Sequence, residues 1–416
     1  MIKLPYRCIL ILSVSSCRLS PPSGCCELAA LLMLNFPLTS EPAMKALSYC
    51  LIFATMLFLG CASDSESQSV ESGPAQWVTY EGQDGAGNGK HIVLVSGDEE
   101  YRSEEALPQL AKILSQRHGF KTTVLFAQDP AHPGIIDPNY TDNIPGLESL
   151  GSADLMVLFT RFRALPDDQM QHFDDYLMAG KPLIAIRTAT HAFQFNDSTS
   201  NWVHWSNSHN VDGHPWDGGF GRLVLGERWH THHGHHKHQS TRGVLAEGAD
   251  DHPINNGIAD GDIWGSTDVY GVRLPMPEDV VPIVMGEVIN RAGEYDEADI
   301  FFGMKPSDTE VATVNPASRS EYNPNDPIMP IAWTKPYQLP EGSEGMAFTS
   351  TIGSSSDMLS EGVRRLLVNA AYHMLDMAVP AEADVSVVGE FAPSAYSFQS
   401  DEYWEEKDLR VADHLE

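Results

Sequence analysis

A short apolar run from His91 to Gly97 is followed by a helical pattern of apolar positions. The run is apolar almost throughout, which is typical of a strand buried in a parallel sheet. Over residues 103–118, four apolar side chains recur at the spacing of one helix face: Leu107, Leu110, Ile113 and Leu114. Ser103 can cap this helix and Gly119 can end it. The pattern therefore predicts a strand followed by a helix.

Similar blocks recur along the chain. We expect further strands at 122–127, 154–160, 182–187, 281–286, 328–335 and 345–351, with helices at 167–179 and 358–377. Strands alternating with helices predict an α/β domain over 91–379, with a doubly wound, mostly parallel sheet and helices on both faces. Residues 193–279 fit no strand–helix unit and are rich in His, Gly, Trp and Asp. We expect long inserted loops there.

The first 61 residues have the features of a targeting segment. Met44 and Lys45 precede an apolar run at 46–60, which suits a signal peptide better than a membrane span of about 20 residues. The run ends in a lipobox-like sequence at Cys61. We therefore expect Cys61 to be lipidated and to anchor the protein to a bacterial membrane, in the periplasm or at the cell surface. The alternatives are a plain cleaved signal and an uncleaved anchor, and the true start is either Met44, which we favour, or Met1.

Two polar segments flank the predicted domain. Residues 62–90 are rich in Ser, Gly, Glu and Gln with little periodicity, which predicts a flexible tether. Residues 380–416 form an acidic tail that contains Tyr396, Phe398, Tyr403 and Trp404. This tail either packs across the domain or stays loose.

Cysteine use and charge exclude several classes of function. All six cysteines lie in the first 61 residues: Cys8, Cys17, Cys25, Cys26, Cys50 and Cys61. The predicted domain therefore has no disulfide, no thiolate metal site and no cysteine nucleophile. The chain has 57 acidic and 26 basic residues, a formal net charge of −31. Such a charge repels nucleic acid and anionic headgroups, so we expect membrane contact only through the lipid.

Polar side chains follow three of the predicted strands. Ligands in open parallel sheets bind beyond the carboxyl ends of the strands, where these loops meet. The candidate substrate-binding residues there are Asp98, Glu100 and Tyr101 after the first strand, Arg161 after the third, and Thr188 after the fourth. A later polar turn at 266–271 adds Tyr270, and the strand expected at 328–335 adds Trp333. Acids, bases and donors gathered in this way suit a polar substrate such as a sugar.

The turn after the fourth strand carries the first catalytic candidates. Arg187 can clamp a developing oxyanion, and His191 can act as an acid or base. A capping or packed histidine is the alternative for His191. Thr188 or Thr190 offers a hydroxyl nucleophile, but the turn has no G-x-S-x-G elbow, and we favour hydrogen-bonded turn residues for both.

Histidines gather in the long loops. Eleven of the 17 lie between His191 and His252, and six of them lie in nine residues at 230–238. Neutral imidazoles bind zinc and other divalent ions, and we expect His232 and His233 to be the ligands if a metal is present. His233 and Asp268 are also candidate catalytic groups, Asp268 as a base or substrate-gripping acid. A loosely constrained polar loop and ordinary turn chemistry are the alternatives.

These segments together resemble the ThuA-like (trehalose-utilisation) family of the class I glutamine amidotransferase-like superfamily. The resemblance spans about 91–377 and rests on HIVLVSGDEEYRSEEALP, GKPLIAIRTATHAF, FGRLVLGERWHTHHG, DHPI, STDVYGV, MPIAWTKPY and GMAFTSTIGSSSDMLSEGVRRLLVNAAYHML. It implies a flavodoxin-like fold and a role in sugar catabolism, without the amidotransferase thiol. The family has an Ile-His pair after the fourth strand, whereas this chain has Ile186-Arg187 with the histidine at His191.

Three hypotheses follow. The first is an exported ThuA-like enzyme that acts on a sugar or keto-sugar by acid/base chemistry, either as a lyase or isomerase or by hydrolysis. The second is a non-catalytic sugar-binding lipoprotein, in which tryptophans stack on sugar rings: Trp202, Trp205, Trp216 and Trp229. The third is a metal-dependent hydrolase that uses the histidine-rich loop.

Overall fold

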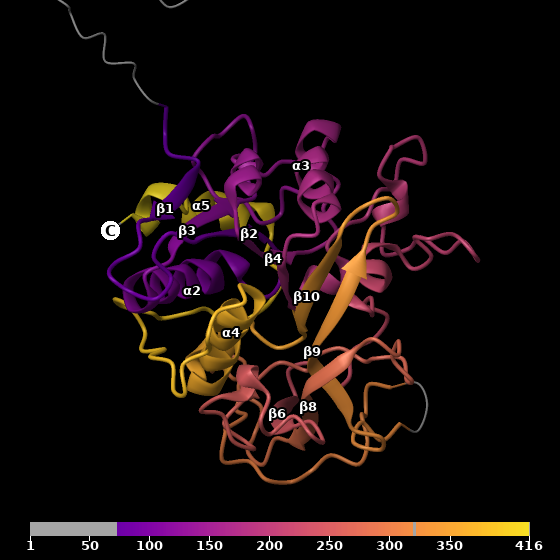
Figure 1. Cartoon of the computed structure of the whole chain (residues 1–416). Helices are drawn as coiled ribbons and strands as arrows, with labels where there is room; N and C mark the ends of the chain where they lie inside the picture. The colour runs from indigo at the N-terminus through magenta and orange to yellow at the C-terminus, as the bar shows by residue number, and fades with distance from the viewer. Residues whose placement is uncertain (1–72, 319–321, 416) are drawn as a thin grey trace, which may run out of the picture. The chain divides into compact units, whose positions relative to one another are not determined.

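The computed structural model describes residues 73–318 and 322–415. Their strands are β1 (Trp77–Tyr80), β2 (His91–Gly97), β3 (Lys121–Phe126), β4 (Leu155–Thr160), β5 (Leu183–Ile186), β6 (Gln239–Leu245), β7 (Trp264–Gly265), β8 (Val281–Asn290), β9 (Met329–Gln338) and β10 (Glu344–Ser350). Their α-helices are α2 (Ser103–His118), α3 (Asp167–Met178), α4 (Glu361–Met374) and α5 (Asp401–Lys407) (Figure 1). Short helical turns are η1 (Leu147–Ser152), η2 (Arg187–His191), η3 (Val203–Trp205), η4 (Gly221–Leu225), η5 (Pro253–Asn255), η6 (Asp357–Leu359) and η7 (Val411–His414).

The described strands form one mixed sheet in the order β1-β3-β2-β4-β5-β10-β9-β8-β6-β7. The five strands from β3 to β10 in this order are parallel to their neighbours. β1 is antiparallel at one edge, and β9, β8, β6 and β7 continue antiparallel at the other. The α/β class is confirmed, but the sheet is half antiparallel rather than mostly parallel. The reason is that β9 joins β10 through a hairpin, a connection too short for a parallel crossover.

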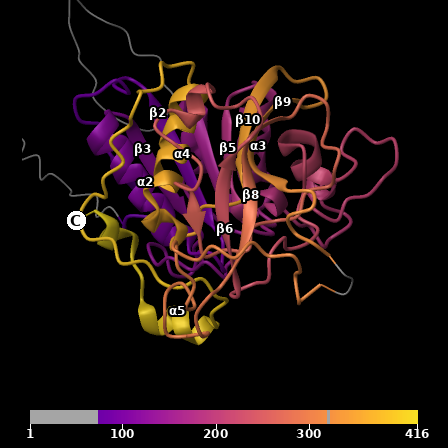
Figure 2. The ribbon, with the colours of Figure 1, turned by 90° about the horizontal axis from the view of Figure 1, so that it is seen from below.

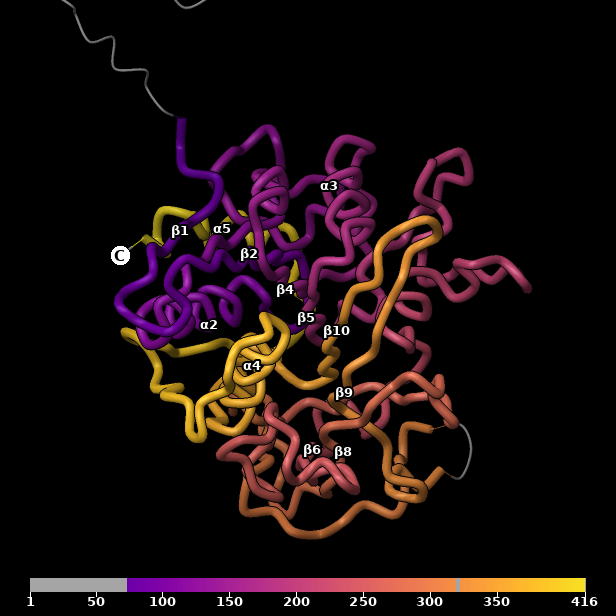
Figure 3. Tube along the Cα trace, in the orientation of Figure 1, coloured from indigo at the N-terminus to yellow at the C-terminus, as the bar shows by residue number. Residues whose placement is uncertain are grey.

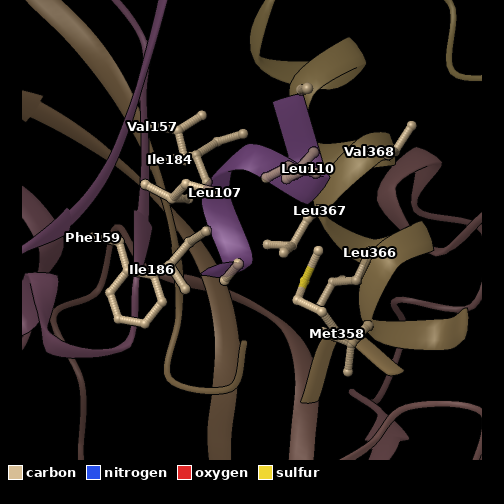
Figure 4. Close-up of a cluster of buried hydrophobic side chains, with 14 of the residues drawn as sticks. Leu107, Leu110, Val157, Phe159, Ile184, Ile186, Met358, Leu366, Leu367 and Val368 are labelled. Carbon is tan, nitrogen blue, oxygen red and sulfur yellow. The ribbon is translucent and has the colours of Figure 1, made fainter. Parts of the chain in front are cut away.

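Helices cover both faces of the parallel half of the sheet (Figure 2). Side chains alternate between the two faces along each strand, so Ile92 and Leu94 of β2 enter one apolar core while Val93 and Val95 enter the other. The first core is closed by α2 and α4, as Figure 4 shows for Leu107 and Leu367 against Ile184 of β5. The second is closed by α3 and η1. These two cores fix the strand ends from which the functional loops leave.

The boundaries of the parallel half follow the sequence pattern closely. α2 spans the predicted residues, and Gly119 ends it in a left-handed conformation at φ 81°. Ser103 is not its cap, because Arg102 precedes the helix in a left-handed conformation and the Ser103 hydroxyl accepts a hydrogen bond from the Asp98 N–H (3.0 Å). The expected closing helix at 358–377 is shorter, since its first turn is the separate turn η6.

The segments that flank the predicted domain are partly ordered. β1 lies within residues 62–90, where composition predicts a tether, so the tether does not extend over Trp77–Tyr80. The acidic tail packs back across the domain, and Figure 3 follows it from α4 toward β1. Tyr396, Trp404 and Val411 are buried, and the Tyr80 hydroxyl donates to the His414 carbonyl (2.7 Å). The tail is thus part of the fold.

Among the described residues, no helix is both long and apolar enough to cross a membrane. The apolar run at 46–60 and Cys61 lie outside the described residues.

Glu104, in the first turn of α2, gives the fold a pH-dependent stability. Its side chain is buried 3.8 Å from the Arg102 guanidinium, and burial raises its pKa from 4.5 to about 8. The folded protein therefore keeps a proton that the unfolded chain loses, and its stability falls as pH rises from about 4.5 to about 8. Glutamine cannot ionise, so we expect Glu104→Gln to remove this fall. The change in the free energy of unfolding caused by the substitution should be roughly 2 to 4 kcal/mol more favourable at pH 9 than at pH 5. Urea unfolding at both pH values measures this; an equal effect at the two contradicts it.

Candidate functional site

Loops from both halves of the sheet surround a small cavity. Its volume is about 30 Å³, and it is lined by Glu100, Arg161, Phe162, His191, Trp229, His232 and Tyr270. Glu100 follows β2, Arg161 follows β4, and His191 ends the turn after β5, so three carboxyl strand ends meet here as expected. The long loops supply the other side. Six of the residues singled out from the sequence are brought together: Glu100, Arg161, His191, Trp229, His232 and Tyr270.

The loop after β2 is held in place by its own acidic residues. Asp98 is buried, and its carboxylate accepts hydrogen bonds from the backbone N–H groups of Glu100 (2.9 Å) and Tyr101. Glu99 binds Arg161 and also Arg163, whose Nη2 lies 2.7 Å from Glu99 Oε2. Asp98 thus anchors the loop and does not line the cavity, which differs from its predicted contact with substrate.

The Glu100 carboxyl group is the acidic wall of the cavity. Oε2 lies 4.0 Å from Arg161 Nε, and Oε1 lies 3.7 Å from His236 Nε2. Burial and the nearby Asp98 carboxylate raise the pKa of Glu100 to about 7, despite the opposing effect of His236 and Arg161. Arg161 is one-fifth exposed and packs over the rings of Phe162 and Phe398 at 4.7 and 4.9 Å. It therefore stands at the mouth of the cavity.

Arg187 lies behind the cavity and not in its wall. Its φ is 46°, a left-handed conformation that turns the chain sharply after β5. The guanidinium is fully buried, donates to the Thr351 carbonyl (2.7 Å), and lies 3.8 Å above the Tyr101 ring and 4.7 Å above the Tyr270 ring. Burial opposes the charge, but these two tyrosines and Asp268 outweigh it and raise the pKa of Arg187. It is a fixed internal cation.

His191 has the arrangement of a neutral base. The Thr190 hydroxyl donates to the Arg187 carbonyl (3.2 Å), so its oxygen accepts from His191 Nδ1, 3.1 Å away. This contact leaves the ring lone pair on Nε2. The ring packs against Phe162, Trp229 and Tyr270, with centroids 4.9 to 5.5 Å apart. Burial, together with Arg161 and Arg187, holds its pKa well below the usual range.

The threonines of this turn have structural places. Thr190 bridges Arg187 and His191 as described, and Thr188 is buried without lining the cavity. Within the described ranges the Thr188 hydroxyl has no hydrogen-bond partner, so no base there activates it as a nucleophile. The turn supplies a histidine rather than a hydroxyl to the cavity.

Asp268 joins two of the loop histidines. It is fully buried; Oδ2 lies 2.5 Å from His232 Nδ1, and Oδ1 lies 3.2 Å from His236 Nδ1. Burial alone would raise its pKa, but the two imidazoles hold the pKa of Asp268 well below its usual range. In turn, Asp268 raises the pKa of His232 against the effect of burial. The residues meet because the backbone of His232 pairs with that of Tyr270 in an antiparallel bridge.

Two predicted site residues lie elsewhere. His233 is buried with Nδ1 3.0 Å from the Tyr322 hydroxyl, and it is not in the group of potential metal ligands, which consists of His232, His236 and Asp268. Trp333 lies inside the sheet, where its Nε1 donates to the Leu225 carbonyl (2.7 Å). Neighbours in sequence on extended backbone point to opposite sides, which separates His233 from His232.

The sequence did not single out His236 or Phe162. His236 belongs to the histidine-rich run, but only its contact with Asp268 distinguishes it from the rest of that run. Phe162 lies between two arginines that follow β4, in a left-handed conformation at φ 49°. Three of the tryptophans suggested for stacking on sugars, Trp202, Trp205 and Trp216, are instead buried in the second apolar core. Trp229 alone of these lines the cavity.

A larger open groove of about 510 Å³ lies beside the start of α4. Its Arg364 is engaged by backbone carbonyls, with Nε donating to Val385 (2.7 Å) and Nη1 to Met358 (2.6 Å). No acid–base pair of the kind found around His191 faces it among the described residues that line it. The smaller cavity is therefore the candidate site.

No protein-family model and no curated protein matches the chain. Similar solved structures are a protein from Bacteroides uniformis described as ThuA-like (12% identity, 74% of this chain and 99% of that chain, TM-score 0.41) and one from Parabacteroides merdae described in the same way (12%, 74% and 97%, TM-score 0.36). A cytoplasmic protein from Salmonella typhimurium is also similar (12%, 70% and 99%, TM-score 0.29). Likeness at this distance shows nothing about what the chain binds.

Proposed function

We propose that this protein acts on a sugar or keto-sugar by acid/base chemistry, with His191 as the base. The observation that carries the proposal is the cavity itself, in which a neutral imidazole faces the same space as a carboxyl group and a guanidinium. Trp229, Tyr270 and Phe162 give it aromatic walls, and ligand sites commonly combine such walls with a few placed polar groups. The ThuA-like resemblance supports a carbohydrate as the ligand, and the order of the parallel strands supports a flavodoxin-like core.

The proposed step on a keto-sugar is removal of the proton next to the carbonyl group. The carbon–hydrogen bond breaks, and the proton passes to His191 Nε2. The electron pair moves onto the carbonyl oxygen, giving an enolate, and the Arg161 guanidinium stabilises that oxyanion. Return of a proton to the same carbon gives exchange. Isomerisation needs a further transfer, in which the hydroxyl proton on that carbon passes to the enolate oxygen and the former carbonyl carbon takes a proton, so that the carbonyl group moves to the neighbouring carbon.

Entry of a sugar requires the cavity to open. Its volume of about 30 Å³ holds a single water molecule. Ligand pockets are typically about 300 Å³ or larger. Arg161 is one of the partly exposed members of the wall and the one with a long, charged side chain, so we propose that substrate displaces this side chain and then binds it.

Proton exchange in D₂O tests the proposal. Purified protein is incubated with trehalose and with a keto derivative of trehalose, and ¹H NMR follows the protons next to the carbonyl. We expect these protons to exchange for deuterium in the keto-sugar and none to exchange in trehalose. Binding of the keto-sugar without exchange or turnover favours a sugar-binding protein instead, and an absence of binding contradicts both.

We also propose that Cys61 carries a lipid that anchors the protein outside the cytoplasm; the lipobox-like ending of the apolar run supports this. Cys61→Ser is then expected to move the protein from the membrane fraction to the soluble fraction of cells. Equal partitioning of the variant and the wild type between the two fractions would contradict the proposed lipid anchor at Cys61.

A further inference from the structure

His232, His236 and Asp268 each offer one ligand atom, and these atoms lie within 4.8 Å of one another. We propose that they form a site for a divalent transition metal of the zinc type. The predicted pair of His232 and His233 is thereby replaced, since His233 faces Tyr322. The inference does not depend on the proposed reaction, because it is tested by metal binding.

One of the contacts around Asp268 leaves two buried polar atoms without an acceptable hydrogen bond, although Asp268 Oδ1 is hydrogen-bonded to His236 Nδ1 (3.2 Å). Asp268 Oδ2 and His232 Nδ1 are 2.5 Å apart, yet neither atom has a hydrogen-bond partner with acceptable geometry among the described residues. An unsatisfied pair of buried polar atoms is costly. A cation bound by both lone pairs satisfies the two atoms at once. Zinc bonds of about 2.0 Å place two ligand atoms roughly 3 Å apart, so His232 and Asp268 must separate by about 0.5 Å when the ion binds. Two imidazoles and one carboxylate also make up a common ligand set of catalytic zinc, with a fourth position left open.

The atoms beyond the ligands have the arrangement expected around a metal-bound histidine. His236 directs Nδ1 to Asp268 and Nε2 to Glu100, whose Oε1 is 3.7 Å away. A carboxylate on the second ring nitrogen fixes the tautomer and orientation of a ligating imidazole. At 3.7 Å the contact is an ion pair and not a hydrogen bond, and a shift of about 0.5 Å would make Glu100 the positioning carboxylate for His236.

The backbone holds the ligands in place before any ion binds. The Gly234 N–H donates to the Asp268 carbonyl (2.9 Å), and the His233 N–H donates to the Val269 carbonyl (3.1 Å). These bonds tie the histidine loop to the segment that carries Asp268. His232 also lines the cavity. The side chains of His232 and His236 are partly exposed, so the site is open on the side of these imidazoles. A substrate oxygen can therefore approach an ion bound there.

Arg187 is the main opposing charge, since Nη2 lies 4.0 Å from Asp268 Oδ1. Without a metal, Asp268 would serve only as the centre of an ion-pair cluster with Arg187 and the two histidines. The two arrangements differ in one measurable property, the affinity for a divalent ion.

The test is zinc binding by the purified protein, measured by elemental analysis after dialysis and by titration with zinc chloride. We expect about one zinc per chain in the wild type. His236→Ala, which alters a partly exposed side chain, should weaken binding on the order of 100-fold, and Asp268→Asn should do the same. Glu100→Gln should weaken it roughly 10-fold, the effect of losing a second carboxylate contact.

His233→Ala and His238→Ala are the matched controls, since both lie in the same histidine run and outside the three-residue group. They should bind zinc as the wild type does. Circular dichroism of each variant establishes that it is folded. A wild type without stoichiometric zinc, or equal losses in the His236 and His238 variants, would overturn the site. Zinc binding without proton exchange in a keto-sugar would support the metal site and contradict the proposed function.

Discussion

Arg187→Met is expected to lower the free energy of unfolding by about 3 to 5 kcal/mol. The guanidinium is fully buried and stacks between two tyrosine rings, with one hydrogen bond to the Thr351 carbonyl. Methionine fills much of the space but removes the charge that faces Asp268, 4.0 Å away. The carboxylate is then buried with less compensation, and such a loss costs far more than a surface ion pair contributes. Urea unfolding followed by circular dichroism measures the change.

A surface arginine provides the comparison. Arg117 is 37% exposed and lies 4.0 Å from Asp384, so Arg117→Met should change stability by less than about 0.5 kcal/mol. The double variant Arg187→Met with Asp268→Asn removes both buried charges and should recover part of the loss. Equal effects of the Arg117 and Arg187 variants, or strict additivity in the double variant, would mean that Arg187 is not the counter-charge of Asp268.

His191→Asn is expected to reduce the rate of keto-sugar proton exchange by about 10² to 10⁴-fold, the usual contribution of a positioned general base. The asparagine amide can still donate to Thr190, as His191 Nδ1 does, but it has no ring nitrogen with a lone pair. Ligand affinity should change much less than the rate. Exchange rates by NMR and binding by titration calorimetry separate the two quantities.

His233→Ala is the control for this loss, because His233 is equally buried but faces Tyr322. It should keep exchange within a few-fold of the wild type. If both variants lose exchange together, the loss reflects the fold. If His191→Asn keeps its rate, His191 is a packed histidine and not the base.

The parallel half of the fold was accessible from sequence because its signals are local. Apolar runs mark β2, β4 and β5, and a helix period with Gly119 marks α2 to its last residue. β6 and β7 were not predicted because they lie in the segment expected to form long loops, where tertiary contacts decide which strands pair. β1 was not predicted because Trp77–Tyr80 is too short to show a strand pattern within a polar segment.

The candidate site divides in the same way. Glu100, Arg161 and His191 were accessible because each follows a recognisable strand, and such loops meet at one sheet edge. The roles of Arg187 and His233 could not be predicted from the sequence. The burial of Arg187 behind the cavity and the direction of the His233 side chain in its loop both depend on tertiary packing. His236 contacts Asp268 because a β-bridge pairs two segments that are more than 30 residues apart in the sequence. Residue spacing alone does not predict such a pairing.

The most direct test of the account is a crystal structure of the protein with a keto-sugar bound. We predict that the sugar occupies an opened form of the cavity, with the carbon next to its carbonyl group at His191 Nε2 and the carbonyl oxygen at the Arg161 guanidinium. A sugar bound instead in the groove beside Arg364 and Val385, with the cavity around His191 still closed, would contradict it.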